Sequence, residues 1–288
     1  MSQAALSVRK PALDFDRAID RFYMGGDPVK SHIFNALNLL FPDGERFFVK
    51  SVHDHTKDIA DDAELLRAVR GFAGQEGQHA HQHERFFAVM NQQGYRFGYF
   101  LKHFHGQVRW GNKWLPRALR LSLTAGAEHY TATMAALVLK HGILDDCDPT
   151  MRDLITWHAV EEIEHKHVAY DLLVKLHPRN YLLRMLGFFL ATFSIFGTAA
   201  FAFSFLVRQD LRAGRVTRAQ LRAGGRGLLS GKELRFRRGV RRAILQYFRP
   251  GFHPNQNDDT SLLDRYAPGI KLAVSSGTAG HAAAAPAQ

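Results

Sequence analysis

The sequence predicts an all-α protein whose centre is a four-helix bundle. Helix start and stop signals divide residues 31–178 into helical segments, and no convincing strand-like alternation appears there. The connections are short enough to bring neighbouring helices together. A chain of 288 residues with 46% hydrophobic content is also long enough to bury a sizeable core.

Proline marks two early boundaries. Residues 1–30 contain turn signals and should form an irregular arm. A short apolar helix over 31–40 should stop before Pro42, which should open the next helix because its missing N–H would be unsatisfied there anyway. We expect that helix to run to about Lys57.

Capping residues define the later helices. Asp61 or Asp62 should cap a long helix that ends at Gly94, a residue free to adopt the left-handed conformation. An aromatic-rich loop over 95–115 should follow. Two further helices are predicted, over 116–142 and 149–175.

Carboxylates and imidazoles recur at helical spacing on these segments. Glu76 and His79 lie three residues apart on one face of the second helix, and Glu162 and His165 repeat that spacing on the fourth. Single glutamates occupy apolar stretches of the first and third helices. His158 lies on the same stripe as Glu162. The predicted metal ligands are Glu45, Glu76, His79, Glu128, His158, Glu162 and His165.

One group on each of four helices, in the order Glu, Glu-x-x-His, Glu, Glu-x-x-His, is typical of ferritin-like di-iron and di-manganese carboxylate proteins. Bridging carboxylates would neutralise two neighbouring ions, and imidazoles would complete the coordination. Oxygen and nitrogen ligands without thiolate suit iron first, with manganese or zinc as alternatives.

Other residues are weighed as supports or alternatives. Glu45 taken alone reads as a glutamate favoured near a helix start, and His158 as a hydrogen-bonding neighbour of the ligands. His83, Asp54 and Asp171 are candidates to hold or orient ligating imidazoles. Glu161 and Glu164 fall on other helix faces, so their substitution should leave metal bound.

The stretches FPDGERFF, GQEGQHAHQH, EEIEHKHVAYD and YFRPGFHP resemble a bacterial family of predicted metal-dependent hydrolases with a ferritin-like fold. The resemblance spans about residues 28–270 and implies that Glu45, Glu76, His79, His83, Glu162 and His165 belong to the metal site. The spacing around His158 also resembles the p-aminobenzoate N-oxygenase group of di-iron oxygenases.

Three functions fit these observations. The first is a di-iron oxygenase or oxidase that acts on a hydrophobic small molecule and needs a redox partner. The second is a hydrolase in which two metal ions activate water. The third is a non-enzymatic protein, either a metal-storage protein or a membrane-bound structural protein.

Positive charge is concentrated in one segment. Residues 208–242 contain twelve Arg or Lys against two acidic residues, a net charge of +10 in a chain with a total of +11. This placement argues against specific nucleic-acid binding along the domain and for a localised anionic surface.

Beside the basic segment, Met185–Val207 is a run of 23 residues without charge, long enough to span a membrane. A single crossing would place the basic segment outside, against the positive-inside tendency. A re-entrant or in-plane hairpin bent near Gly197 is therefore favoured, with a buried helix or the seam of a homodimer as the alternative. Arginines beside it would bind anionic headgroups.

The sequence thus divides into an arm (1–30), a di-metal bundle (31–178), a hydrophobic segment (179–207), a basic segment (208–271) and a disordered tail (272–288). The single cysteine, Cys147, excludes an internal disulfide framework. The N-terminal residues lack the apolar core of a secretory signal. We expect a cytoplasmic protein at the inner face of the membrane.

Overall fold

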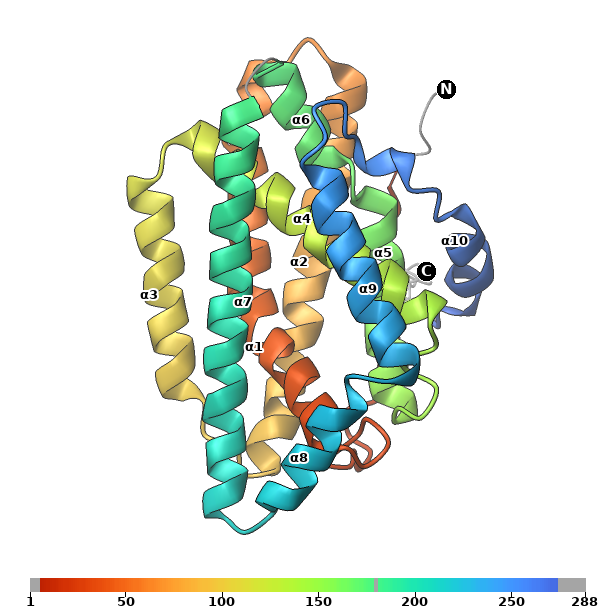
Figure 1. The fold of residues 1–288 in the computed structure, drawn as a ribbon. Coiled ribbons are helices and arrows are strands. Elements are labelled where there is room, and N and C mark those ends of the chain that lie inside the picture. Colours follow the sequence, from red (N-terminus) through yellow and green to blue (C-terminus); the bar gives the residue numbers. More distant parts are fainter. Residues whose placement is uncertain (1–5, 179–180, 274–288) are drawn as a thin grey trace, which may run out of the picture.

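A computed structural model describes residues 6–178 and 181–273. The prediction of an all-α protein is confirmed, and the described residues form no β-strand (Figure 1). The main helices are α1 (Pro28–His53), α2 (Ala63–Gln92), α3 (Gly98–Trp114), α4 (Arg117–Lys140), α5 (Pro149–His165), α6 (Val168–Leu176) and α7 (Tyr181–Arg212). The C-terminal part adds α8 (Arg218–Gly227), α9 (Gly231–Tyr247) and α10 (Thr260–Tyr266).

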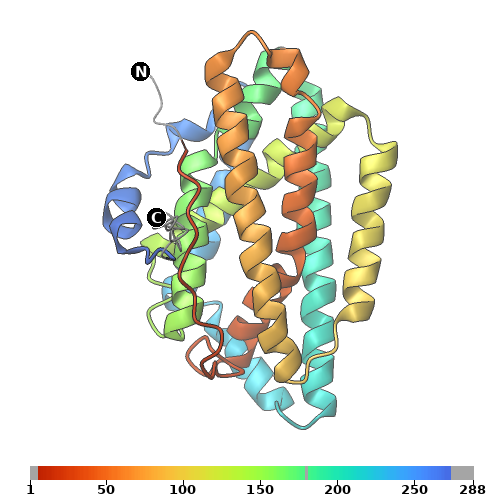
Figure 2. The same ribbon diagram turned by 180° about the vertical axis from the view of Figure 1, so that it is seen from behind.

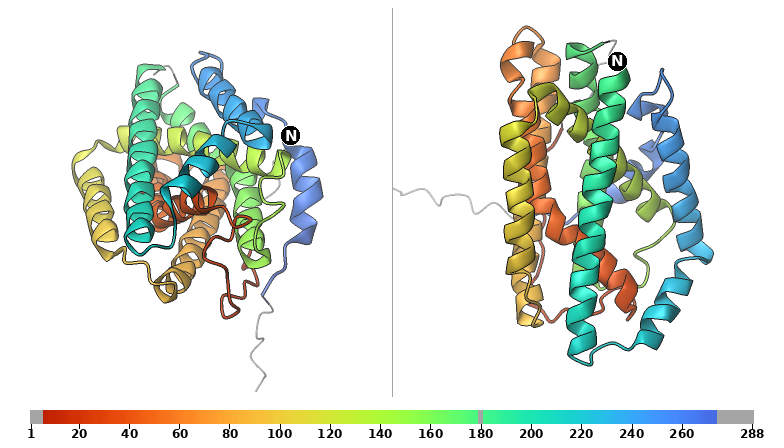
Figure 3. Two further views of the ribbon diagram at one scale, coloured as in Figure 1. Left: turned by 60° about the horizontal axis from the view of Figure 1, so that its bottom comes forward. Right: turned by 60° about the vertical axis from the view of Figure 1, so that its left-hand side comes forward.

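The first helix differs from its prediction. One helix over 31–40 and a second from Pro42 to about Lys57 were expected, but α1 is continuous through that buried proline and ends at His53. Proline removes one helical hydrogen bond and clashes with the preceding turn, and the two halves of α1 run at different angles (Figure 3). Asp27 caps the start by accepting from the backbone N–H groups of Val29 and Lys30.

The second helix begins and ends as predicted. The carboxylate of Asp62 accepts from the backbone of Leu65, and Gly94 has a φ of 84° just beyond the end. The predicted aromatic loop after it is wrong, because residues 98–114 form α3. Phe100 and Phe104 are buried one turn apart on this helix, which therefore has an apolar face that many aromatic and glycine residues obscure in the sequence.

The fourth predicted helix is divided. α5 ends at His165 and α6 begins at Val168, where one helix to about Lys175 was expected. The intervening Lys166 donates hydrogen bonds to the carbonyl oxygen of Asn257 and to Asp259, so contacts with the C-terminal segment accompany the break.

The hydrophobic segment is one continuous helix, so the predicted hairpin bend near Gly197 is wrong. α7 packs against α4 and α1, and α4 crosses it obliquely (Figure 3). The approach to α4 is close: a Cβ on Gly126 would lie 2.8 Å from the Cα of Phe188. One side of α7 is therefore covered by the bundle, and the other carries exposed leucines and phenylalanines.

The N-terminal arm runs extended along α2 and α5 (Figure 2). A Cβ on Gly71 or Gly74 would lie 2.7 Å from Leu6 or 2.6 Å from Val8, so these two glycines make room for the arm. The backbone N–H of Ala12 donates to Lys271 near the other end of the chain. Most of the predicted disordered tail, from 274 on, lies outside the described residues.

Candidate metal centre

Four helices bring the seven predicted ligands into one buried cluster. α1 contributes one carboxylate, α2 a glutamate and a histidine, α4 one carboxylate, and α5 a glutamate and two histidines. The glutamates and histidines of the cluster are all buried, with at most 7% of any residue exposed. Helical periodicity thus aligns the donors within each segment, and packing makes the four sets converge. The residues are Glu45, Glu76, His79, Glu128, His158, Glu162 and His165.

Two glutamates lie between imidazoles. One oxygen of Glu162 is 3.1 Å from Nε2 of His158, and its other oxygen is 3.7 Å from Nε2 of His165. Oε1 of Glu76 is 3.1 Å from the same nitrogen of His165 and 3.7 Å from Nδ1 of His79. Each of the two carboxylates therefore lies between two of the imidazoles.

The donor atoms divide into overlapping sets whose members lie within 4.8 Å of one another. Glu76 and His79 each occur in two sets, and the other five residues occur in one. The sets are Glu45, His79 and His158; Glu76, Glu128 and His165; and Glu76, His79 and Glu162.

Many of these donor atoms lack a hydrogen bond. Both carboxylate oxygens of Glu45, Glu76 and Glu128 have no hydrogen-bond partner among the described residues, nor does Nδ1 of His79 or Nε2 of His165. The latter nitrogen lies near carboxylates, yet without hydrogen-bond geometry. Buried polar atoms are normally satisfied. Converging lone pairs of this kind fit positive ions, so the residues present suit a two-metal centre.

The electrostatics of the cluster lead to the same interpretation. Burial, reinforced by neighbouring carboxylates, raises the pKa of Glu45 well above its usual range and that of Glu128 to about 7. Burial opposes ionisation of Glu162 as well, but the neighbouring imidazoles of His158 and His165 outweigh it and hold the pKa of Glu162 well below its usual range. Carboxylates buried this close together are costly to ionise without a nearby positive charge, and two divalent ions would supply that charge.

Comparison with known families supports a metal-dependent protein. Residues 7–258 match the family model described as predicted metal-dependent hydrolase. This chain belongs to that family. No curated protein and no solved structure matches it. All seven clustered residues fall within the matched range, so metal dependence has support from the family and from the donor geometry together.

In this member of the predicted metal-dependent hydrolase family, two residues outside the cluster of seven form hydrogen bonds with two of its histidines. Nδ1 of His165 lies 2.9 Å from Oε1 of Gln75, and Nε2 of His79 lies 3.1 Å from Oε2 of Glu161. An outer acceptor places the proton on the outer ring nitrogen and turns the inner lone pair toward a metal. The two contacts are reciprocal, because each joins α2 to α5 through the residue that directly precedes Glu76 or Glu162.

The N-terminal arm also contributes to the outer layer, the hydrogen-bonding residues packed behind the candidate ligands. The guanidinium of Arg9 donates to both oxygens of Glu164 at 2.7 Å, and the backbone N–H of Arg9 donates to Glu161 at 3.2 Å. Gln75 donates to Glu164 at 3.0 Å. Glu161 was predicted to be dispensable because it lies off the ligand stripe, but it is fully buried against a candidate ligand. Its position directly before Glu162, matching Gln75 before Glu76, was the available signal.

The three predicted supporting residues have different outcomes. His83 lies beside the cluster, with Nε2 at 2.8 Å from Nδ1 of His158 and Nδ1 at 2.6 Å from Asn38. The structure does not bring the two aspartates to a candidate ligand, so their predicted role is wrong. Asp54 pairs with Arg120 at 2.5 Å, and Asp171 pairs with His253 at 2.7 Å. Each aspartate pairs with a basic side chain outside the cluster of candidate ligands.

An apolar groove of about 640 Å³ reaches the cluster between α1, α3, α4 and α7, and Glu45 lies in its wall. A smaller pocket of about 70 Å³ lies beside His83 and His158. Both spaces are lined by Leu37, Phe41, Thr131 and Met134.

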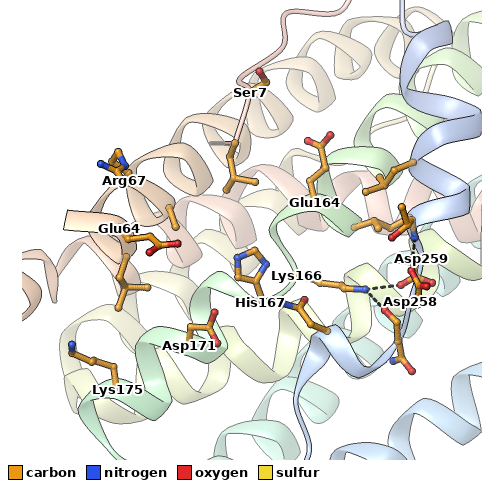
Figure 4. A pocket seen from close by; sticks show the side chains of 18 of the residues that line it. Ser7, Glu64, Arg67, Glu164, Lys166, His167, Asp171, Lys175, Asp258 and Asp259 are labelled. Carbon is orange, nitrogen blue, oxygen red and sulfur yellow. Dashed lines mark hydrogen bonds and ion pairs between the residues drawn. The ribbon is translucent and has the colours of Figure 1, made fainter. Parts of the chain in front are cut away.

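A larger cleft, with a volume of about 1270 Å³, lies elsewhere (Figure 4). Its wall carries several charged side chains, among them Glu164. Lys166 in the same wall pairs with Asp259 at 2.7 Å. This cleft meets the outer hydrogen-bond layer of the cluster, whereas the apolar groove meets the candidate ligands.

Proposed function

We propose that this protein is a two-metal hydrolase that cleaves a bond in a largely apolar substrate. The observation that carries the proposal is the position of Glu45, which belongs both to the seven-donor cluster and to the wall of the apolar groove. A substrate in the groove would therefore present its reactive bond to the cluster. The groove volume of about 640 Å³ lies within the roughly 300–1,000 Å³ of small-molecule sites.

The position of each residue in the cluster indicates which part of the two-metal site it would form. Glu76 and Glu162 would hold two ions side by side, with Glu45 and His158 on the groove side and Glu128 and His165 at the far end. When bound, such ions supply a nucleophilic water at neutral pH and polarise a substrate oxygen.

The outer contacts would keep the histidine rings fixed. Gln75 and Glu161 would hold the inner nitrogens of His165 and His79 unprotonated and aimed inward. In the reaction, water would add its oxygen to the electrophilic atom and its proton to the leaving group.

Aromatic esters with acyl chains of graded length would test this proposal. Purified protein is loaded with Fe(II), Mn(II) or Zn(II), and hydrolysis is measured without oxygen. We expect metal-dependent hydrolysis that improves with chain length and is lost in Glu162→Ala. Glu84→Gln on the exposed face of α2 is the control and should keep activity. Hydrolysis that is equal with and without metal would refute the proposal.

Oxygen activation is the second candidate. It is favoured by the donor set itself, because four carboxylates with three histidines in a helical bundle match the di-iron carboxylate arrangement. Iron would then be the required ion and a redox partner would supply electrons. An iron-loaded protein that bleaches on reduction, reoxidises in air and consumes oxygen with an apolar substrate would favour this candidate over hydrolysis.

A further inference from the structure

The uncovered side of α7 is a continuous apolar stripe. Its residues recur at alternating spacings of four and three, so they share one helix face. Phe193 is 82% exposed, and the other five are also exposed. The stripe consists of Leu182, Leu186, Phe189, Phe193, Phe196 and Ala200.

Aromatic residues of α3 extend this surface. Tyr99, Trp110 and Trp114 are 71%, 60% and 63% exposed. α3 and α7 are neighbours on one side of the molecule (Figure 3), and the apolar groove lies between them with Trp110 and Phe193 in its wall. Exposed tryptophan and tyrosine are typical of the boundary between lipid and water.

Positive charge borders the same surface. All eleven arginines of residues 208–242 are exposed. The two acidic residues of this segment are already paired elsewhere, since Asp210 binds Arg21 and Glu233 binds Lys30. α8 and α9 carry most of these arginines; they pack on α1 and α4 respectively, on the side of α7 away from α3 (Figure 1). Phe248, just after α9, contacts Phe189 of the stripe.

We propose that this surface docks on an anionic lipid membrane and that an acyl chain of a membrane lipid enters the groove toward Glu45. The substrate part of this inference rests on the proposed function, whereas the docking part does not.

An in-plane position fits the packing of α7. This is the one described helix long and apolar enough to span a membrane, but its inner side is bound along its length to α4 and α1. A crossing would carry those helices and their buried carboxylates into hydrocarbon, at high cost. Docking leaves the bundle in water and covers only the stripe and the α3 aromatics.

The positive charge of residues 208–242 also favours a membrane, and not a second copy of this chain, as the partner that covers the stripe. A symmetric dimer through the stripe would bring two segments of net charge +10 near each other. Anionic headgroups would instead attract these arginines, at about 1 kcal/mol for each basic residue near the surface.

Docking is tested with the full chain by vesicle flotation and tryptophan fluorescence. We expect binding to phosphatidylglycerol vesicles to exceed binding to phosphatidylcholine vesicles and to weaken with salt. Brominated acyl chains should quench the wild type, but not a Trp110→Phe/Trp114→Phe variant, whose remaining Trp157 is buried. Replacing Arg237, Arg238, Arg241 and Arg242 by Gln should remove the preference for anionic lipid.

Entry of an acyl chain into the groove is tested separately, with a phosphatidylglycerol that carries a photoreactive group on its acyl chain. A Cβ on Gly197 would meet nothing within 4 Å, and this residue lines the groove, so Gly197→Phe should narrow it without a clash. We expect at least a tenfold loss of crosslinking, with flotation and metal content unchanged. Gly77→Phe on α2, also in open space, is the matched control.

Two results would overturn the inference. Absence of vesicle binding together with a stable dimer that Phe193→Ser dissolves would show that a second copy covers the stripe. Unchanged crosslinking in Gly197→Phe would show that lipid does not enter the groove. Neither result depends on hydrolysis, so failure of the proposed function alone, seen as normal loading without activity, remains distinguishable.

Discussion

The outer partner of His79 offers a sharp test of the metal centre. Glu161→Gln replaces a carboxylate that accepts from Nε2 of His79 at 3.1 Å in a fully buried position. The glutamine amide keeps the shape of the side chain but holds the His79 ring less firmly. Nδ1 of His79 therefore becomes a weaker metal ligand. Loss of such an outer partner typically weakens metal binding by about 10–100-fold, or roughly 1.4–2.7 kcal/mol.

Competition with a chromophoric chelator would measure this loss, with metal analysis and circular dichroism on the same samples. Glu84→Gln is the matched control, because Glu84 forms only an exposed pair with Arg46 at 2.6 Å, worth about 0–1 kcal/mol. Glu162→Ala should lose most of its metal. The reasoning is refuted if Glu161→Gln binds metal as the wild type does while remaining folded.

Three further predictions concern stability. Asp210→Asn should lower the free energy of unfolding by about 3 kcal/mol in urea titrations, because buried Asp210 binds Arg21 and Tyr95. Burial lowers the pKa of His129 to about 4; since the unfolded value is about 6.5, stability should fall by up to ~3 kcal/mol from pH 6.5 to 4. His129→Phe should lose less over that window; an equal loss would contradict this. Removing metal should lower the melting temperature, because free metal at 1,000 times its Kd stabilises the folded state by about 4 kcal/mol. Adding the metal back should restore the melting temperature.

The sequence by itself determined the identity of the clustered donors. Spacings of three and four residues place Glu76 with His79, and Glu162 with His165, on single helix faces whatever the fold. Local signals also determined several boundaries, because a capping carboxylate such as Asp62 and a left-handed glycine such as Gly94 act within a few residues of the helix end.

Where tertiary contacts compete with local signals, the sequence was a poor guide. Pro42 favours a break, yet packing on both sides of α1 keeps that helix continuous. The 95–115 segment reads as a loop, but two buried phenylalanines one turn apart hold α3 against its neighbours. Gly197 suggested a bend, and contacts with α4 and α1 keep α7 continuous.

The outer layer of the metal centre was decided only by the tertiary structure. Arg9 reaches Glu161 across 152 residues of sequence, and Gln75 reaches His165 across 90. Helical periodicity relates residues within one segment, so it identifies donors that share a face. It carries no information about which side chain of a distant segment will pack behind them, because that depends on how the helices and the arm are arranged in space.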